Sequence, residues 1–119
     1  MSDHTNLVVW HRAHRLVIAI SHSLKSDTSR RMPGLRAQLL RSAASIAANI
    51  AEGASRESRR EYARFVTIAL SSASETESHL MLAIDLGCVR GDSTALLLET
   101  RRIRAMLFKL RAYLQRICQ

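Results

Sequence analysis

The chain has 119 residues, which suits one domain and leaves too little for two. Apolar residues make up 47% of it and aromatic residues only 4%, with one proline and four glycines, which favours an all-α fold, because sheets need β-branched and aromatic residues and many turns. The formal net charge is +8, and sixteen of the 18 basic residues are arginine. Because the planar guanidinium group of arginine binds phosphate or carboxylate, the composition favours an anionic partner, with RNA or DNA ahead of a membrane.

The first two predicted helices cover about residues 6–24 and 34–52, and a polar segment ending in Pro33 and Gly34 is typical of the connection between them. Each helix has apolar residues at spacings of three and four, the period of an amphipathic helix. Gly53 is a candidate C-cap for the second helix, because glycine adopts a left-handed conformation without a Cβ clash. The two stripes are Val9, Ala13, Leu16, Ile20 and Leu24, and Leu35, Leu39, Ala43, Ile46 and Ile50.

The third and fourth helices are predicted over about residues 57–86 and 93–117. Ser58 and Glu61 have the spacing of a capping box, Gly87 stops the third helix, and Asp92 or Ser93 caps the fourth. The stripe of the fourth follows a heptad seam: Ile103, Leu107, Leu110, Leu114 and Ile117. Short connections favour antiparallel neighbours, so residues 1–119 are predicted to form one up-down-up-down four-helix bundle.

The basic residues of the last helix form the candidate nucleic-acid surface. No acid follows Thr100, and the seam leaves the cations on its exposed face: Arg101, Arg102, Arg104, Lys109, Arg111 and Arg116. A second basic group, Arg30, Arg31, Arg36 and Arg41, lies earlier in the chain, and a third, Arg56, Arg59, Arg60 and Arg64, alternates with Glu57 and Glu61 and therefore suits surface ion pairs.

Polar residues also form stripes on two helices. In the second helix these are Arg41, Ser45, Asn49 and Glu52, and in the third they are Ser71, Glu75 and Ser78. If the stripes face each other, Arg41 should compensate Glu75, Glu77 or both, within the chain or across subunits, because buried charges persist when paired. Alternatively, one stripe faces water.

These residues carry a resemblance. The stretches RSAASIAANIAEG (41–53) and FVTIALSSASETESHL (65–80) resemble the four-helix bundle protein family also called 23S rRNA intervening-sequence proteins, whose pattern is approximately R-A-x-x-S-I-x-x-N-I-A-E-G, then F-x-x-I-A-x-x-S-x-x-E-x-E. The resemblance spans about residues 7–87, and Asn49 to Gly53 are its most specific part. The chain departs from the family at two positions. Gly34 stands where an acid is usual, and Ala43 is the second residue after the single Arg41, whereas a pair of arginines commonly precedes the alanine in the family.

The resemblance implies an up-down four-helix bundle, commonly assembled as a ring-like homopentamer. Some relatives are encoded within insertions in large-subunit rRNA genes, and the similar accessory protein of diversity-generating retroelements binds nucleic acid and a reverse transcriptase. The resemblance implies the polar layer Arg41, Ser45, Asn49, Glu52, Gly53, Glu75 and Glu77. Apart from the resemblance, Leu96, Leu97 and Leu98 cannot all face one core, which indicates self-association.

We expect no enzyme, and therefore no catalytic residue, metal or cofactor. A di-iron bundle needs two Glu-x-x-His pairs, which the chain lacks, and Cys88 and Cys118 have neither zinc nor disulfide-framework spacing. His11 and His14 lack a third metal ligand and should flank Trp10 at the surface. Arg15 and His22 resemble the R-x6-H ribonuclease motif of HEPN-type bundles, a weaker alternative.

Two main hypotheses follow. The first is a homo-oligomeric scaffold that binds RNA or a nucleoprotein through the last helix. The second is a structural or protein-partner module whose arginines contact acids of neighbouring subunits. The first hypothesis predicts RNA binding that depends on salt concentration, and the second predicts no such binding.

Overall fold

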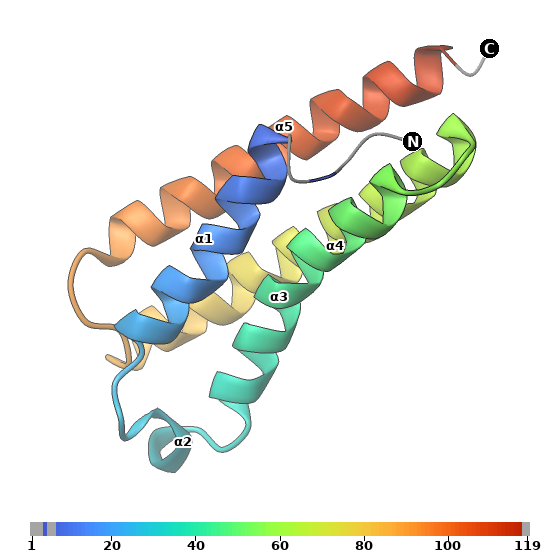
Figure 1. Ribbon diagram of the computed structural model, residues 1–119. Coiled ribbons are helices and arrows are strands. Elements are labelled where there is room, and N and C mark those ends of the chain that lie inside the picture. Colours follow the sequence, from blue (N-terminus) through green and yellow to red (C-terminus); the bar gives the residue numbers. More distant parts are fainter. Residues whose placement is uncertain (1–3, 5–6, 118–119) are drawn as a thin grey trace.

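The computed structural model describes residue 4 and residues 7–117, and these contain five helices (Figure 1). The helices are α1 (Val8–Ser23), α2 (Thr28–Arg31), α3 (Leu35–Ala54), α4 (Arg59–Asp85) and α5 (Ser93–Ile117). The predicted all-α class is confirmed, and the four long helices correspond to the four expected ones. The expected helix start at Asn6, and Cys118, lie outside the described residues.

The four long helices form one elongated bundle of 48 × 20 × 20 Å (Figure 1). Each packs against two neighbours: α1 and α4 both lie against α3 and α5. Successive long helices run in opposite directions, which is the expected up-down-up-down order. The short helix α2 was not expected; it occupies the connection between α1 and α3.

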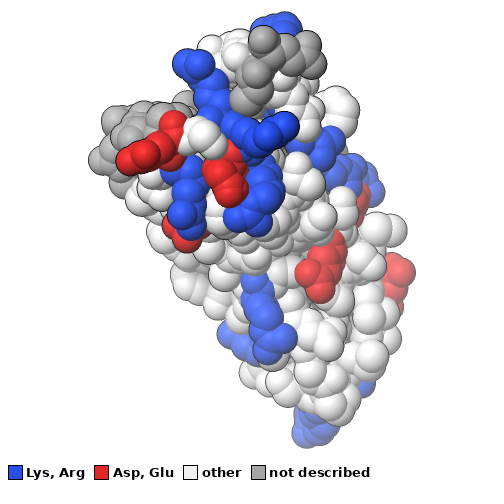
Figure 2. All heavy atoms as spheres, turned by 90° about the vertical axis from the view of Figure 1, so that its right-hand side faces the viewer, with Lys and Arg blue, Asp and Glu red and all other residues white. Residues whose placement is uncertain are grey.

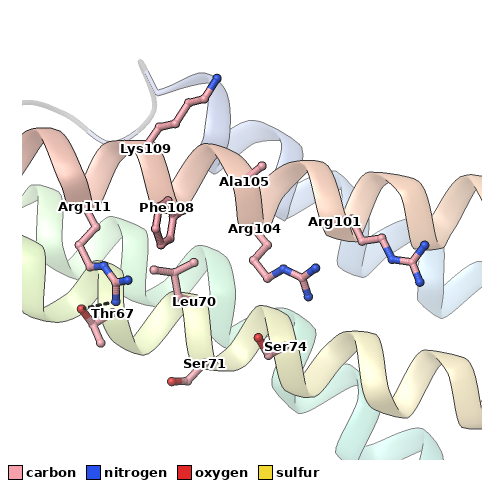
Figure 3. Close-up of a pocket in the computed structure, with 10 residues that line it drawn as sticks. All are labelled: Thr67, Leu70, Ser71, Ser74, Arg101, Arg104, Ala105, Phe108, Lys109 and Arg111. Carbon is pink, nitrogen blue, oxygen red and sulfur yellow. Dashed lines mark hydrogen bonds between the residues drawn. The ribbon is translucent and has the colours of Figure 1, made fainter.

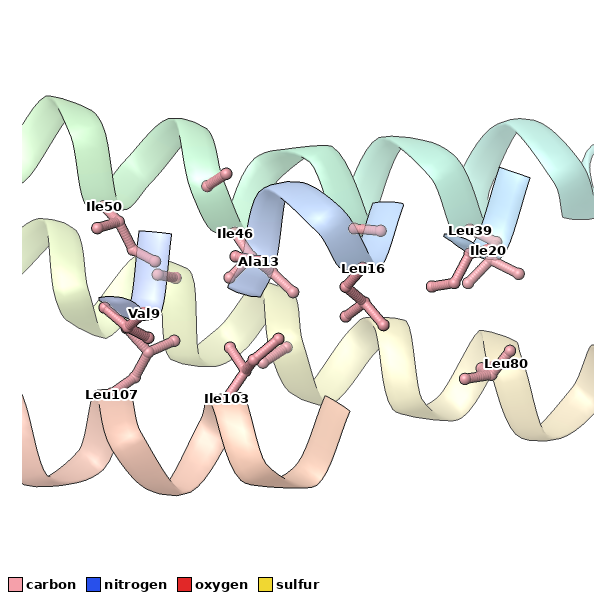
Figure 4. Close-up of a cluster of buried hydrophobic side chains, with 14 of the residues drawn as sticks. Val9, Ala13, Leu16, Ile20, Leu39, Ile46, Ile50, Leu80, Ile103 and Leu107 are labelled. Atoms are coloured by element: carbon pink, nitrogen blue, oxygen red, sulfur yellow. The ribbon is translucent and has the colours of Figure 1, made fainter. Parts of the chain in front are cut away.

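The core follows the predicted stripes closely. Every member of the first two stripes is buried, and Ile103, Leu107 and Leu114 of the predicted α5 seam are buried with them. Figure 4 shows these aliphatic side chains meeting along the bundle axis. Of the three consecutive leucines in α5, Leu96 is buried and Leu98 is 55% exposed, as expected for a run that cannot face one core.

Three helix ends form where the sequence predicts them. The Ser58 side chain accepts a hydrogen bond from the Glu61 backbone N–H at 3.0 Å at the start of α4. Helix α4 ends at Asp85, and Gly87 follows with a φ of 72°. The carboxylate of Asp92 accepts from the backbone N–H of Ala95 at 3.2 Å, which caps α5. These helix ends are therefore defined by local interactions.

Gly53 has a different role from the predicted C-cap. Helix α3 continues through it to Ala54, and among the described glycines only Gly34, Gly87 and Gly91 have a positive φ. A Cβ at position 53 would lie 2.9 Å from Cδ1 of Tyr62 and 3.0 Å from Cβ of Phe65. The missing side chain is therefore needed for the close approach of α4 to α3, and the cap prediction is wrong.

Candidate nucleic-acid interface

An open groove of about 780 Å³ runs between α4 and α5, and we call it the α4–α5 groove. Four of the six predicted cations, Arg101, Arg104, Lys109 and Arg111, line it, whereas Arg102 and Arg116 do not. In Figure 3, Arg104 and Phe108 extend from α5 toward α4, and Lys109 extends from the opposite side of α5. The remaining lining residues are Thr67, Leu70, Ser71, Ser74, Ala105 and Phe108.

One acid on α4 partly neutralises the groove. Glu77, whose side chain is 15% exposed, accepts hydrogen bonds from both Arg101 and Arg104. The hydrogen bond from Arg101, supported by that from Arg104, holds the pKa of Glu77 below its ordinary value. Because the acid comes from another helix, a search for partners at helical spacing within the last helix could not find it. One carboxylate facing two guanidinium groups leaves the cluster cationic.

Hydroxyl groups and an aromatic ring complete the groove. Arg111 donates to Oγ1 of Thr67 at 3.4 Å, and Ser71 and Ser74 contribute further hydroxyls from α4. The ring of Phe108 is 58% exposed, and the Arg111 guanidinium lies 5.4 Å from its centroid. The sequence reasoning missed Phe108, although its place beside the seam residue Leu107 puts it off the buried stripe. An exposed ring among cations is a platform on which a base can stack.

The α5 cations outside the groove are exposed. Arg102 lies on the outer face of α5, and Arg116 places its guanidinium 5.7 Å from the ring centroid of Tyr113, which is 50% exposed. The third basic group is paired in part as expected, because Arg56 contacts Glu52 at 3.0 Å and Arg64 contacts Glu61 at 2.8 Å. Figure 2 shows such interleaved basic and acidic side chains at one end of the molecule.

The polar layer between α3 and α4 is made of hydroxyls. Oγ of Ser45 lies 2.9 Å from Oγ of Ser72, and Oγ1 of Thr76 lies 3.0 Å from Oγ of Ser42. Asn49 donates to Oγ of Ser45 at 2.9 Å. Ser45 and Asn49 were expected in this layer. On α4, however, Ser72 and Thr76 face α3 in place of the expected Ser71 and Glu75. A shift of one position corresponds to a rotation of α4 by about 100° about its axis.

The expected charged pairs of that layer are absent within the described part of the chain. Arg41 is exposed and makes no ion pair there, Glu75 lies 3.5 Å from His79, and Glu77 contacts α5 instead. Glu52 pairs with Arg56 on the surface. A pairing of Arg41 with an acid across subunits stays a prediction.

The residues weighed for catalysis do not converge. Arg15 lines a depression between α1 and α5, whereas His22 lines another at the end of α1. His11 and His14 flank Trp10 as expected, with ring centroids 5.1 and 5.0 Å from the tryptophan ring. Among the described residues, no three His, Cys, Asp or Glu side chains gather as metal ligands, and no helix is long and apolar enough to cross a membrane.

The family model of the 23S rRNA-intervening sequence protein matches residues 5–109. The chain belongs to this family. A solved structure of similar fold is that of a protein of unknown function from the S23 ribosomal protein family of Bacteroides thetaiotaomicron, with a TM-score of 0.72 and 24% sequence identity over 87% of this chain and 98% of that one. Comparison with curated proteins found no match. The family match agrees with the sequence resemblance, which covers about residues 7–87, and extends it to residue 109, within α5.

The Glu77 cluster gives a pH-dependent contribution to stability. Because its pKa is lowered by folding, the contribution is present above the unfolded value near 4.5 and is lost as the pH falls through the folded value. We expect Glu77→Gln to lower the free energy of unfolding by about 1 kcal/mol at pH 7, and by progressively less as the pH falls below about 4.5. Urea unfolding followed by circular dichroism measures this, with Glu57→Gln, an exposed acid, as control. A pH-independent difference would contradict it.

Proposed function

We propose that the protein is a non-enzymatic, cytoplasmic scaffold that assembles with copies of itself and binds RNA, alone or within a nucleoprotein, along the α4–α5 groove. One observation carries the proposal. The groove is lined by four cationic residues, three hydroxyls and an exposed aromatic ring, and Glu77 engages two of its arginines. Cations and hydroxyls bind phosphate, and a ring stacks on bases, so the combination suits a nucleic-acid strand.

The spacing of the cations supports an extended ligand. Arg101 and Arg111 are ten residues apart on one helix, which is about 15 Å at about 1.5 Å per residue. Phosphates of one strand follow one another at about 3.4 Å along a duplex, so several could lie against this length. The groove is open to solvent rather than enclosed, as a strand requires. The family is named after rRNA intervening sequences, which further supports RNA as the ligand.

Self-association is supported by apolar side chains left outside the bundle. Val8 at the start of α1 is 62% exposed, and Leu98 on α5 is 55% exposed. Burying such groups against a second copy would remove apolar surface from water at about 25 cal/mol per Å². A ring-like pentamer, as the family resemblance implies, is the assembly we propose.

A second candidate is a protein-partner module without a nucleic-acid role. It is favoured by Phe108 and Tyr113, two exposed rings on α5 that could equally pack against a protein. In that case the groove arginines would contact acids of the partner. The two candidates differ in one measurable property, the response of RNA binding to salt.

An RNA titration at two salt concentrations, with light scattering on the same sample, tests the proposal. We expect a mass several times the 13.3 kDa of one chain, and an RNA affinity that falls steeply between low and physiological salt, because bound phosphates release counterions. Three or four phosphate contacts give a slope of roughly −2 to −3 in log affinity against log salt. Absent or salt-independent RNA binding would favour the protein-partner module, and a monomeric mass would refute the assembly.

A further inference from the structure

A second basic depression shares no lining residue with the α4–α5 groove. It lies at the end of the bundle where α1 ends and α3 begins, and Figure 1 shows α2 at this end. Its volume is about 540 Å³, and it lies between the end of α1, the start of α3 and the segment before α5. Two arginines, a histidine and two serines supply its polar lining, and the full set is Ser21, His22, Leu24, Ser26, Arg36 and Arg90. No carboxylate is among the described residues that line it, and the proposed RNA binding does not use it.

The depression is held in place by contacts between two connections. The backbone N–H of Arg90 donates to the carbonyl of Ser23 at 2.7 Å, and that of Lys25 donates to the carbonyl of Cys88 at 2.8 Å. A bridge between Leu24 and Val89 lies between these two bonds. The Arg90 guanidinium also donates to the carbonyl of His22 at 2.9 Å. The side chain of Arg90 is therefore positioned before any ligand arrives.

Arg36 has unused hydrogen-bonding capacity in this depression. It is half-buried, yet within the described part of the chain its guanidinium makes no hydrogen bond or ion pair. The acid nearest in sequence, Asp27, is already engaged by Arg31 at 2.9 Å. A guanidinium left unpaired in such a hollow favours an anion, since no acid among the described residues compensates its charge.

We propose that this depression binds a phosphate monoester group. The two guanidinium forks, the imidazole and the hydroxyls of Ser21 and Ser26 approach from three segments of the chain. A tetrahedral phosphate with three terminal oxygens can accept from several such directions at once, whereas a carboxylate offers two oxygens in one plane. The group can belong to a small phosphorylated molecule or to the 5′ end of an RNA. The inference does not depend on the proposed function of the groove.

Amide NMR spectra of the full chain, titrated with inorganic phosphate against chloride at equal ionic strength, test the site. We expect shifts concentrated at residues 21–26, at 36 and at 88–91, and an affinity about tenfold weaker in Arg36→Gln, which loses a charge-assisted contact. Arg60→Gln is the matched control, because it removes one exposed arginine at the other end of the bundle and should bind phosphate as the wild type does. Shifts that are absent, or unaffected by Arg36→Gln, would overturn the proposal.

A second arm identifies the source of the phosphate. Two RNA oligonucleotides of one sequence, with a 5′-phosphate or a 5′-hydroxyl, are compared on the wild type and on Arg36→Gln. Tighter binding of the phosphorylated RNA that is abolished in Arg36→Gln assigns the site to an RNA end. Equal binding of the two RNAs, together with Arg36-dependent shifts from inorganic phosphate, assigns it to a small molecule. Variants of the groove are expected to leave the phosphate shifts intact, because the two sites share no lining residue, so each proposal can fail alone.

Discussion

Replacing Arg104, Lys109 and Arg111 together with glutamine is expected to weaken RNA binding by about a hundredfold at about 0.1 M salt. All three line the α4–α5 groove, and none belongs to the core. Each lost phosphate contact to a single strand reduces the slope of log affinity against log salt by about 0.7. At this salt concentration, one lost contact lowers the affinity about fivefold. Fluorescence anisotropy with a labelled RNA at several salt concentrations measures both the affinity and its slope.

The matched control removes three arginines elsewhere. Arg30, Arg59 and Arg60 are exposed, and the one ion pair that they make within the described residues is the 4.0 Å contact of Arg30 with Asp27, so their triple replacement with glutamine changes the net charge equally. We expect it to change affinity by only a few-fold, through the long-range field. Glu77→Gln should act in the opposite direction and raise affinity, because it removes the acid that engages two groove arginines. Equal losses of affinity in both triple variants would mean that net charge, and not the groove, binds RNA.

Substitution of Gly53 should destabilise the bundle more than its single added methyl group suggests. We expect Gly53→Ala to lower the free energy of unfolding by about 1–2 kcal/mol, and Gly53→Val by about 3 kcal/mol. The new Cβ would meet the Tyr62 ring, Cβ of Phe65 and, at 3.2 Å, the backbone carbonyl of Tyr62, so α4 must move away from α3. This cost exceeds the gain of about 1 kcal/mol that alanine brings over glycine inside a helix.

Thermal and urea unfolding of the variants measure this loss of stability. Ala48→Gly is the control, because Ala48 is exposed on α3 and the change reports helix propensity without a tertiary contact. It should cost about 1 kcal/mol. A Gly53→Ala variant more stable than the wild type would show that α4 can move away from α3 without cost, and the close-contact interpretation would fail.

Local signals predicted the helix ends of this fold better than the packing between helices. Ser58, Gly87 and Asp92 define helix ends through bonds or backbone angles within their own segments, so a single sequence contains the information. Gly53 was misassigned because a glycine near a helix end suits a cap equally well, and only the position of Tyr62 decides. Which residues of α4 face α3 depends on a rotation of the helix that a stripe of alanines and serines leaves ambiguous.

The groove illustrates the same limit. The cations of α5 were evident from the sequence, and four of them do line one surface. Their acid, Glu77, lies 24 residues from Arg101, and no spacing rule connects the two positions. Phe108 became a candidate only once its exposure was known. Charge patterning therefore located the helix, whereas the composition of the site depends on how two helices pack.

The hydroxyl layer between α3 and α4 favours one alignment of the two helices. Two helices lined by alanine can slide past each other with little change in packing, since one small methyl group resembles the next. A displacement by one turn would separate Ser42 from Thr76 and Ser45 from Ser72 and would lose both hydrogen bonds between the helices, at about 1 kcal/mol each. The hydroxyls of Ser42 and Thr76 would keep their bonds to carbonyls of their own helices. These four short side chains therefore favour one longitudinal position of the two helices over positions displaced by a turn.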